Sequence, residues 1–373
     1  MRIAVVCYPS YGGSGVVASE LGKAMAARGH QVHFVSYELP FRLRGYQHAI
    51  IFHQVEVPTY PLFKYPPYVL ALTNKLVELA RYGCLDIIHA HYAIPHAVSS
   101  YLAKQLVPEV VTITTLHGTD ITLVGSDPSF SEIISFAINR SDGVTAVSRS
   151  LRAETYRRFT VHRPIRVIPN FVDLQAYRRR PNPELRRCFA PGGEKIVIHV
   201  SNFRPVKRVL AVVEIVAQIR EYLPVRLLLV GDGPDVPAAR RRTRELGLEE
   251  AVLFLGRQDD LVPLLSVADL FLLPSAQESF GLAALEAMAC GVPVVASRVG
   301  GLPEVVDEHS GRLHEVEDLE GMARSAVQIM SEQGVWEDYS EGARRRAEQF
   351  DAQRLVDAYE EFYREILASR RGA

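Results

Sequence analysis

Short apolar runs alternate with longer amphipathic stretches through most of the chain. The first run, Ile3–Cys7, precedes a glycine-rich turn and a helical stretch, Val16–Arg28, and the next run is Gln31–Ser36. Continuous apolar runs are typical of strands buried on both faces of a parallel sheet, and their alternation with helices predicts βαβ units. Further strands are predicted at Ile50–Val57, Asp86–His89, Val111–Leu116, Gly143–Val147 and Arg166–Ile168.

The alternation is interrupted after Pro169-Asn170, where the segment Arg178–Pro183 is charged and irregular. Such a segment is typical of an interdomain linker. A second α/β series follows, with strands predicted at Lys195–Val200, Arg226–Val230, Ala251–Leu255, Leu270–Leu273 and Val292–Ala296, and helices at Val209–Tyr222, Pro237–Leu246, Leu261–Leu265 and Leu282–Ala289. The last ~50 residues are predicted to be helical and are strongly charged. The pattern therefore predicts two doubly wound α/β domains.

The length and composition of the chain agree with two domains and argue against nucleic acids and membranes as partners. A chain of 373 residues is longer than one ordinary core requires, and its net charge of −1 argues against a nucleic-acid-binding protein. No apolar stretch approaches the ~18 residues of a membrane span, so no membrane partner is expected. The first residues enter a strand without a secretory signal pattern, which favours a cytoplasmic location. The four cysteines lack metal-ligand spacing and are interpreted as reduced thiols.

Two carboxylates, Glu278 and Glu286, flank seven residues just after the apolar run Asp269–Pro274. Glu278 falls on the loop that leaves a predicted strand, and Glu286 falls on the following helix, predicted over Gly281–Met288. Open α/β sheets bind ligands at this edge, and helix N-termini attract phosphate. The pattern predicts a nucleotide-sugar site, although the spacing alone also fits a loop carboxylate and a solvated helix position.

Other strand ends carry polar residues of the same kind. Gly12–Gly15 follows the first strand, His117 follows Val111–Leu116, and Ser201–Arg208 follows the first strand of the second domain. Glycines allow a ligand to approach the backbone, and fixed cations suit a diphosphate whose charge grows as it leaves. A tight turn, a core histidine and an exposed basic turn are the alternative interpretations of these three segments.

Taken together, these segments resemble the signature of retaining glycosyltransferase family 4. The resemblance covers Glu278–Glu286, the continuation through Ser297, and Gly300–Glu304. It implies the GT-B fold, in which two Rossmann-like domains face each other across a cleft. Residues 1–172 would bind the acceptor, residues 173–352 would bind the UDP-sugar, and a final helix, 353–373, would return to the first domain.

The resemblance also implies site residues. Those with catalytic roles would be His117, Arg204, Lys207 and Glu278, and those that bind the donor would be Gly13, Arg257, Ser279, Phe280, Gly281, Leu282 and Glu286. In this scheme His117 contacts the sugar 6-hydroxyl and does not act as a base, while Asp120 caps a helix. Arg204 departs from the family, because many members carry their arginine where this chain has Asn202. No metal and no cofactor are expected, since cations and helix amides serve the diphosphate.

Segments of the first domain resemble more narrowly those family members that transfer N-acetylglucosamine from UDP-GlcNAc to L-malate. They include Gly12–Val17, Leu39–Leu43, His89–His96, Leu116–Thr122 and Gly125–Ser129. The acceptor contacts would come from Ser14, Tyr92, Thr119, Asn170 and Arg42. Inositol phosphate as the acceptor, a UDP-GlcNAc epimerase of the same fold, and a non-catalytic nucleotide-sugar sensor are the alternatives. A homo-oligomer is compatible with the sequence.

Overall fold

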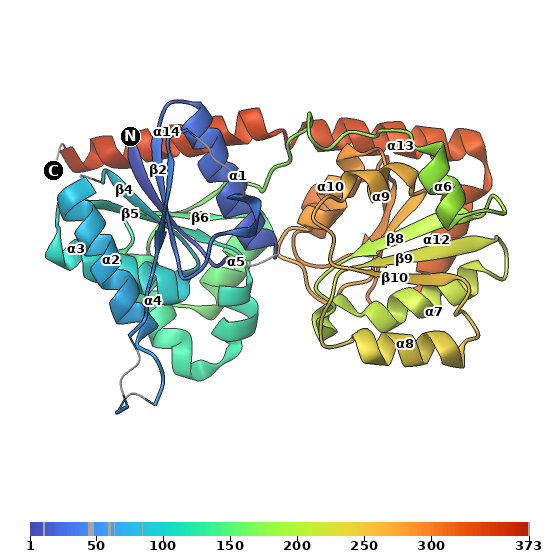
Figure 1. Ribbon diagram of the computed structural model, residues 1–373, viewed down its shortest axis with the longest axis horizontal. Helices are drawn as coiled ribbons and strands as arrows, with labels where there is room; N and C mark the ends of the chain where they lie inside the picture. The colour runs from blue at the N-terminus through green and yellow to red at the C-terminus, as the bar shows by residue number, and fades with distance from the viewer. Residues whose placement is uncertain (10–11, 44–47, 59–60, 63, 84, 372–373) are drawn as a thin grey trace. The chain divides into compact units, whose positions relative to one another are not determined.

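The chain folds as two compact units in the computed structural model, which describes residues 1–9, 12–43, 48–58, 61–62, 64–83 and 85–371. Unit 1 contains residues 1–170 and 353–373, and unit 2 contains residues 171–352 (Figure 1). Each unit is one parallel sheet covered by helices, as alternating strands and helices require.

Unit 1 is built on a seven-stranded sheet in the order β3-β2-β1-β4-β5-β6-β7, and all of its strand pairs are parallel. The order of the strands reverses between β1 and β4. The strands are β1 (Arg2–Val6), β2 (Gln31–Ser36), β3 (Ile50–Gln54), β4 (Ile87–His91), β5 (Val111–Leu116), β6 (Gly143–Ala146) and β7 (Ile165–Val167). The helices that follow them are α1 (Gly13–Ala27), α2 (Tyr68–Gly83), α3 (Val98–Leu106), α4 (Ser131–Arg140) and α5 (Arg149–Arg158).

The last helix, α14 (Ala352–Arg371), completes unit 1 (Figure 1, red). A hydrogen bond of 2.7 Å joins the Tyr363 hydroxyl to His89 Nδ1, and both side chains are fully buried. Phe362 lies so close to Gly143 of β6 that a Cβ there would come within 2.8 Å of its ring. Glu360 Oε1 also lies 3.0 Å from His30 Nε2, and both side chains are mostly buried. The helix is therefore an integral part of the first core although it comes last in the sequence.

Unit 2 is built on a six-stranded parallel sheet in the order β10-β9-β8-β11-β12-β13, with the reversal between β8 and β11. Its strands are β8 (Lys195–Val200), β9 (Val225–Val230), β10 (Val252–Gly256), β11 (Leu270–Leu273), β12 (Val294–Ser297) and β13 (Gly311–His314). Its helices are α6 (Pro183–Phe189), α7 (Val209–Ile219), α8 (Val236–Glu245), α9 (Val262–Val267), α10 (Leu282–Ala289), α11 (Leu302–Val305), α12 (Leu319–Ser331) and α13 (Gln333–Glu348).

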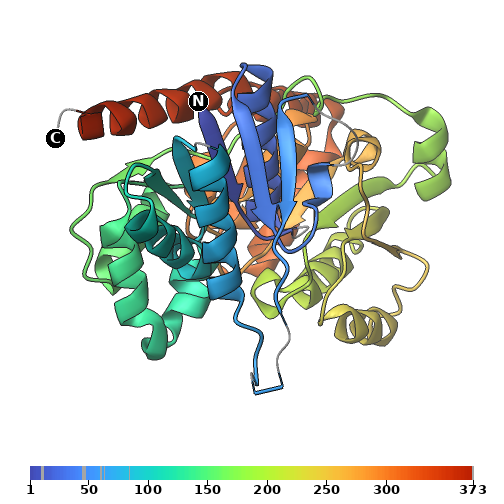
Figure 2. The same ribbon diagram turned by 60° about the vertical axis from the view of Figure 1, so that its left-hand side comes forward.

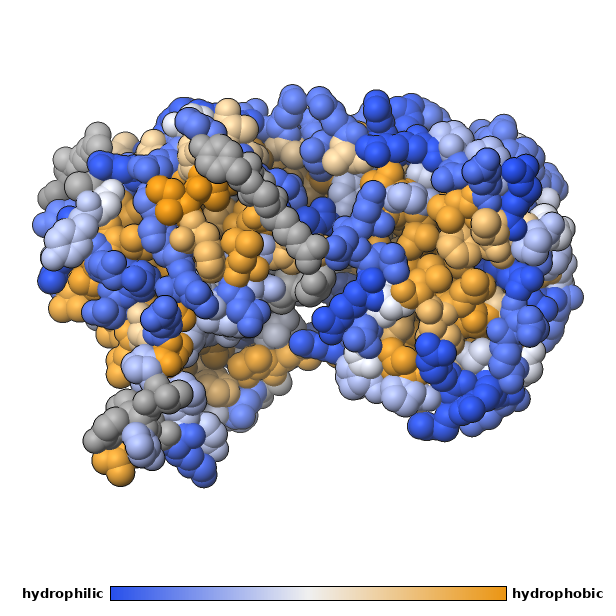
Figure 3. Space-filling view, viewed as in Figure 1, coloured by the Kyte–Doolittle hydropathy of each residue, from blue (hydrophilic) through white to orange (hydrophobic). Residues whose placement is uncertain are grey.

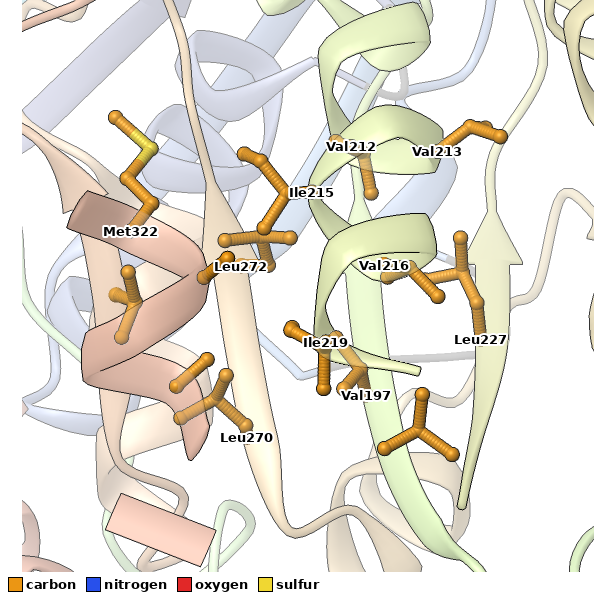
Figure 4. Close-up of a cluster of buried hydrophobic side chains, with 14 of the residues drawn as sticks. Val197, Val212, Val213, Ile215, Val216, Ile219, Leu227, Leu270, Leu272 and Met322 are labelled. Carbon is orange, nitrogen blue, oxygen red and sulfur yellow. The ribbon is translucent and has the colours of Figure 1, made fainter. Parts of the chain in front are cut away.

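The core of unit 2 forms where α7 covers the sheet (Figure 4). Ile215 and Ile219 of α7 lie over Leu270 and Leu272 of β11, and all four side chains are 0% exposed. Met322 of α12 closes the same cluster. Because α7 has eleven residues and only one charged side chain, nearly its whole surface can be buried. The cluster fixes β8 and β11, whose carboxyl ends carry the candidate site.

Two elements of unit 2 differ from the sequence prediction. Helix α6, which was not predicted, begins at Pro183, the last residue of the expected linker, and Asn182 caps it by accepting a hydrogen bond from the Leu185 amide at 3.0 Å. Strand β13, which pairs with β12, was not predicted, because only one of its four residues, Leu313, is strongly apolar. Elsewhere the predicted strands agree with the structure to within a few residues at their ends.

Polar and apolar residues both reach the surfaces of the two units. In the described part of the chain, no helix has the length and apolar composition to cross a bilayer. Hydrophilic and hydrophobic residues are interspersed over each unit on the face shown in Figure 3. Exposed apolar side chains, Leu62 and Tyr65, lie on the connection from β3 to α2, which projects from its unit (Figure 2). Cys7, Cys188 and Cys290 are free thiols, and Cys84 lies outside the described residues.

Candidate active site

In unit 1, polar side chains meet at the carboxyl ends of β1 and β4, where the strand order reverses. Helix α1 begins at Gly13 with no side-chain cap at Gly12, so its first amides are available to a ligand. The Ser14 hydroxyl lies 2.7 Å from the Tyr92 hydroxyl, which follows β4. Ligands of doubly wound sheets bind at such a reversal point. The structure thus brings together two of the residues that the sequence predicted for the acceptor.

A cluster of histidines, His91, His96 and His117, lies at the ends of β4 and β5 and in the loops that follow these strands. His117 follows β5 and its Nε2 is 2.9 Å from His91 Nδ1, at the end of β4. The Nδ1 of the fully buried His96 donates to the His91 carbonyl at 2.6 Å. Burial lowers the pKa of His117 to about 3 and that of His96 to about 4. Both rings are therefore neutral near pH 7, and His117 is suited to hydrogen bonding a hydroxyl.

Asp120 anchors the loop after His117, but its role differs from the predicted helix cap. One carboxylate oxygen accepts from the Gly118 amide at 2.9 Å, and the other accepts from the Ala93 amide at 2.9 Å. The side chain therefore joins the loops that follow β4 and β5, and the turn it belongs to, Thr119–Leu123, has no side-chain cap. Burial raises the pKa of this carboxyl to about 6, against the effect of its amide partners.

The other predicted acceptor residues are spread more widely over unit 1. Thr119 is half-buried and lies beside Asp120. Asn170 is buried, and its Oδ1 has no hydrogen-bond partner in the described part of the chain. Arg42 lies on a short turn, Phe41–Leu43, with its guanidinium 3.8 Å from Glu20 of α1. A role for these residues stays a prediction.

Aromatic residues that were not assigned a role also belong to this cluster. The ring of Tyr8, just after β1, lies 4.5 Å from the His96 ring and 5.5 Å from the Tyr92 ring, measured between centroids. Tyr68, at the start of α2, lies 6.5 Å from His96. Tyr8 could have been found from the sequence because it follows the first strand directly. Tyr68 could not, since it opens a helix far along the chain.

In unit 2, the corresponding reversal point lies between β8 and β11 and carries an ion pair. Lys207 Nζ is 2.5 Å from Glu278 Oε1, and the side chains are 21% and 10% exposed. The Ser275 hydroxyl donates to the same oxygen at 3.1 Å. The loops are also joined through the backbone, because the Ala276 amide donates to the Val206 carbonyl at 2.8 Å. Two residues separated by 71 positions in sequence thus form one charged centre.

The loop that carries Glu278 is supported by a glycine pair. The Gly301 amide donates to the Glu278 carbonyl at 3.0 Å. A Cβ on Gly300 would lie 1.7 Å from that carbonyl oxygen, and one on Gly301 would lie 2.4 Å from the Ser279 oxygen. Only glycine fits at such close backbone approach. The pair therefore fixes the main chain at the start of the candidate donor site.

Helix α10 begins directly after this loop. Gly281 precedes it in the left-handed region, with φ of 100°, and provides no side-chain cap. The amides of Leu282 and its neighbours thus lie at a helix N-terminus, next to the predicted donor residues Ser279 and Phe280. Glu286 is only 6% exposed on α10, so it does not occupy a solvated helix position.

The loop from Ser201 to Arg208 holds the candidate cations. Lys207 ends a short turn that Arg204 precedes, and the Arg204 side chain is exposed. Arg208 turns away, with φ of 49°, and pairs with Glu317 at 2.7 Å. The structure therefore leaves Lys207 and Arg204 as the cations of this loop that a diphosphate could meet.

Further loops complete this edge of unit 2. Gly231 and Gly233 approach the Ser201–Asn202 backbone so closely that a Cβ would lie 1.8 and 2.1 Å from its carbonyl oxygens. Arg257, after β10, is 3.4 Å from Asp232 and largely exposed. Asp260 accepts from the Val262 amide at 3.0 Å and thus fixes the start of α9.

Metal ligands are not grouped in the described residues, where no set of three or more His, Cys, Asp or Glu side chains could hold an ion. The expectation that neither a metal nor a cofactor is required stays a prediction.

Comparison with known proteins identifies the family. The family models "Glycosyltransferase Family 4" and "Glycosyl transferases group 1" match residues 11–176 and 183–346. The N-acetyl-alpha-D-glucosaminyl L-malate synthase of Bacillus anthracis is 48% identical over 371 residues, which cover 98% of this chain and 97% of that protein. The chain is a family 4 glycosyltransferase. A D-inositol 3-phosphate glycosyltransferase of Saccharomonospora viridis is 29% identical, with 97% of this chain and 91% of that protein covered.

Solved structures agree on the fold of this glycosyltransferase. HepE of Anabaena, in complex with UDP and glucose, superposes with a TM-score of 0.83 at 22% identity, over 97% of this chain and 99% of that one. A sucrose-phosphate synthase of Thermosynechococcus elongatus gives 0.81 at 23% identity, over 99% and 100%. At these identities the likeness concerns the fold alone. The predicted GT-B class, with two Rossmann-like domains, is confirmed.

Proposed function

We propose that this glycosyltransferase moves N-acetylglucosamine from UDP-GlcNAc to the hydroxyl of L-malate. The products are GlcNAc-α-malate and UDP, and this is the reaction that begins bacillithiol synthesis. The proposal rests on one observation, the 48% identity to the Bacillus anthracis synthase over nearly the full length of both proteins. Because the identity covers nearly the whole chain, it includes the segments of the first unit that are proposed to bind the acceptor.

Unit 2 supplies the groups that the donor needs. In the proposal, Lys207 and Arg204 neutralise the diphosphate, with help from the amides at the start of α10. Glu278 binds hydroxyls of the sugar, and the buried Glu286 binds hydroxyls of the ribose. The backbone around Arg257 receives the base. Support comes from the Lys207–Glu278 ion pair beyond the carboxyl ends of β8 and β11, and from the buried position of Glu286 on the following helix, α10.

The transfer retains the configuration of the sugar. Paired carboxylates in retaining hydrolases act as nucleophile and acid. The sequence predicts no carboxylate nucleophile on the far face of the sugar, and Glu278 is paired with Lys207, so we propose front-face attack instead. The bond from the acceptor oxygen to C1 forms while the bond from C1 to the diphosphate breaks. The acceptor proton passes to the departing phosphate, and the cations stabilise the developing charge.

Unit 1 supplies the groups proposed for the acceptor and for the sugar 6-hydroxyl. The Ser14 and Tyr92 hydroxyls lie 2.7 Å apart, so both can donate to one carboxylate once the hydrogen bond between them opens. His117 is neutral, and it contacts the 6-hydroxyl without serving as a base. Thr119, Asn170 and Arg42 are the further candidates for the second carboxylate of malate.

The test is UDP release from UDP-GlcNAc in the presence of L-malate, D-malate, inositol phosphate or no acceptor. Release that depends on L-malate, with an α-linked product, is the expected result. Release with inositol phosphate alone would favour the acceptor class of the Saccharomonospora viridis relative, which is more distant at 29% identity. Release without any acceptor would favour an epimerase, and donor binding without turnover would favour a sensor.

A further inference from the structure

Ser275 has no part in the proposed chemistry, yet it contacts the central carboxylate of unit 2. Its hydroxyl donates to Glu278 Oε1 at 3.1 Å, and the residue is 0% exposed. It follows Pro274, only two positions after the end of β11, so it lies at the carboxyl end of that strand. A short side chain with one rotatable bond loses little entropy when it is fixed. Ser275 is therefore well placed to hold the carboxylate in one orientation.

Lys207 shares the same carboxylate oxygen. Among the described residues, the hydrogen bonds to Glu278 from Lys207 and from Ser275 both fall on Oε1. The second oxygen, Oε2, is thus left for a hydroxyl of a ligand. An ionised carboxylate that is only 10% exposed also needs a partner to offset its lost hydration.

The ion pair cannot stay unchanged when a donor binds. A diphosphate carries more negative charge than Glu278 and competes for the same ammonium group. Lys207 has three N–H donors on a flexible stem, so it can shift toward the diphosphate. As it shifts, the Ser275 hydroxyl becomes the main fixed donor to Glu278.

We propose that Ser275 is a positioning residue, which keeps the Glu278 carboxylate directed at the donor sugar while Lys207 serves the diphosphate. This inference rests on the proposed roles of Glu278 and Lys207 in donor binding. It assigns Ser275 an effect on the sugar part of the donor and none on the nucleotide part. A serine that merely stabilised the fold would affect both parts equally.

The experiment measures the affinity of full-length Ser275→Ala for UDP-GlcNAc and for UDP by calorimetry. Loss of a hydrogen bond to a charged group changes a dissociation constant by about tenfold or more, so Ser275→Ala should bind UDP-GlcNAc about tenfold more weakly than the wild type. UDP should bind within about twofold of the wild-type value, because the sugar is absent. The ratio of the two affinities is the readout, and it needs no acceptor.

The chain offers a matched control in Ser297, the last residue of the neighbouring strand β12. Ser297 is also 0% exposed, but its hydroxyl has no hydrogen-bond partner within the described residues. Ser297→Ala removes a buried hydroxyl from the same sheet edge and should leave the affinity ratio unchanged. Ser275→Thr keeps the hydroxyl and should recover much of the wild-type ratio.

A double-mutant cycle shows whether Ser275 acts through Glu278. Residues in direct contact have coupled effects, so Ser275→Ala should cause little further loss in a Glu278→Gln background. Equal losses of UDP and UDP-GlcNAc affinity, or additive effects in the cycle, would overturn the assignment. Failure of the wild-type chain to bind UDP-GlcNAc would instead overturn the proposed function, and the role of Ser275 with it. The cycle remains decisive if Ser275→Thr does not fold.

Discussion

Gly300 provides the sharpest test of how the fold positions the donor site. Its φ of 52° lies in the left-handed region, and a Cβ there would be 1.7 Å from the Glu278 carbonyl oxygen. Carbon and oxygen atoms need about 3.0 Å, so Gly300→Ala must separate the two segments by about 1.3 Å. The left-handed backbone adds about 1–2 kcal/mol of strain for alanine.

This displacement would move Glu278, which pairs with Lys207 and is proposed to bind the donor sugar. A misplacement of about 1 Å can cost about 100-fold in rate, so kcat/KM of Gly300→Ala should fall by about that factor. Overpacking against the Glu278 backbone adds about 1–3 kcal/mol to the loss of stability. The assays are UDP release at varied UDP-GlcNAc and thermal unfolding.

Gly247 provides the matched control. It also has a positive φ, of 64°, but no atom lies within 4 Å of where its Cβ would be. Gly247→Ala should therefore lose about 1 kcal/mol of stability, from backbone strain alone, and keep its kcat/KM. If Gly300→Ala retains a kcat/KM within about twofold of the Gly247→Ala value, the close approach does not position Glu278 and the reasoning is wrong.

Three further predictions concern single groups. Lys207→Ala should lower kcat by about 100-fold or more at saturating UDP-GlcNAc, because it removes charge stabilisation of the leaving group, and a near-native kcat would exclude that role. Tyr363→Phe leaves His89 without its 2.7 Å partner in the core and should cost about 1–3 kcal/mol in urea unfolding, whereas the exposed Tyr222→Phe should cost almost nothing. Desolvation lowers the pKa values of His89, His96 and His117 to about 3, 4 and 3, so between about pH 6.5 and 4 these rings bind protons only in the unfolded chain, and stability should decrease as the pH is lowered through this window. The raised pKa of Asp120, about 6, has the opposite effect, because this carboxyl binds a proton more readily in the folded chain as the pH is lowered. With three histidines against one carboxyl, a constant unfolding temperature from pH 7.5 to 5 would contradict the prediction.

The fold could be predicted where the local signal and the tertiary environment agree. The strands Val111–Leu116, Lys195–Val200 and Leu270–Leu273 have the predicted bounds, because continuous apolar runs are what a sheet covered on both faces requires. Strand β13 was missed because it lies at the edge of its sheet and needs fewer apolar residues. Helix α6 was missed because it begins where the charged run Arg178–Pro183, interpreted as a linker, ends, although Asn182 and Pro183 are strong start signals.

The candidate site could be predicted as a set of segments, but its contacts could not. The rule that ligands bind at the carboxyl ends of strands placed Lys207 and Glu278 at one edge, and the structure shows their ion pair. Ser275 has no signal of its own, because a serine after a strand is common. The helix-cap role predicted for Asp120 was wrong, since its partners, Ala93 and Gly118, become neighbours only when β4 and β5 pair.

The two units apply one topological rule to different chemistry. In each, the strand order reverses beside the first strand of the unit, and the loops at that point carry the polar groups. Unit 1 places hydroxyls and neutral imidazoles there, such as Ser14 and His117, which suit sugar hydroxyls and carboxylate oxygens. Unit 2 places an ammonium and two carboxylates there, Lys207, Glu278 and Glu286, which suit a diphosphate between two polyols. Because burial in unit 1 disfavours protonated histidine, its imidazoles supply no positive charge to the leaving group, and we expect that charge to come from unit 2. Substitutions in unit 1 should therefore change the choice of acceptor more than the affinity for UDP. For Tyr92→Phe we expect the rate of UDP release with L-malate, relative to other acceptors, to change while the affinity for UDP stays the same. A loss of UDP affinity as large as the change in acceptor preference would contradict this division.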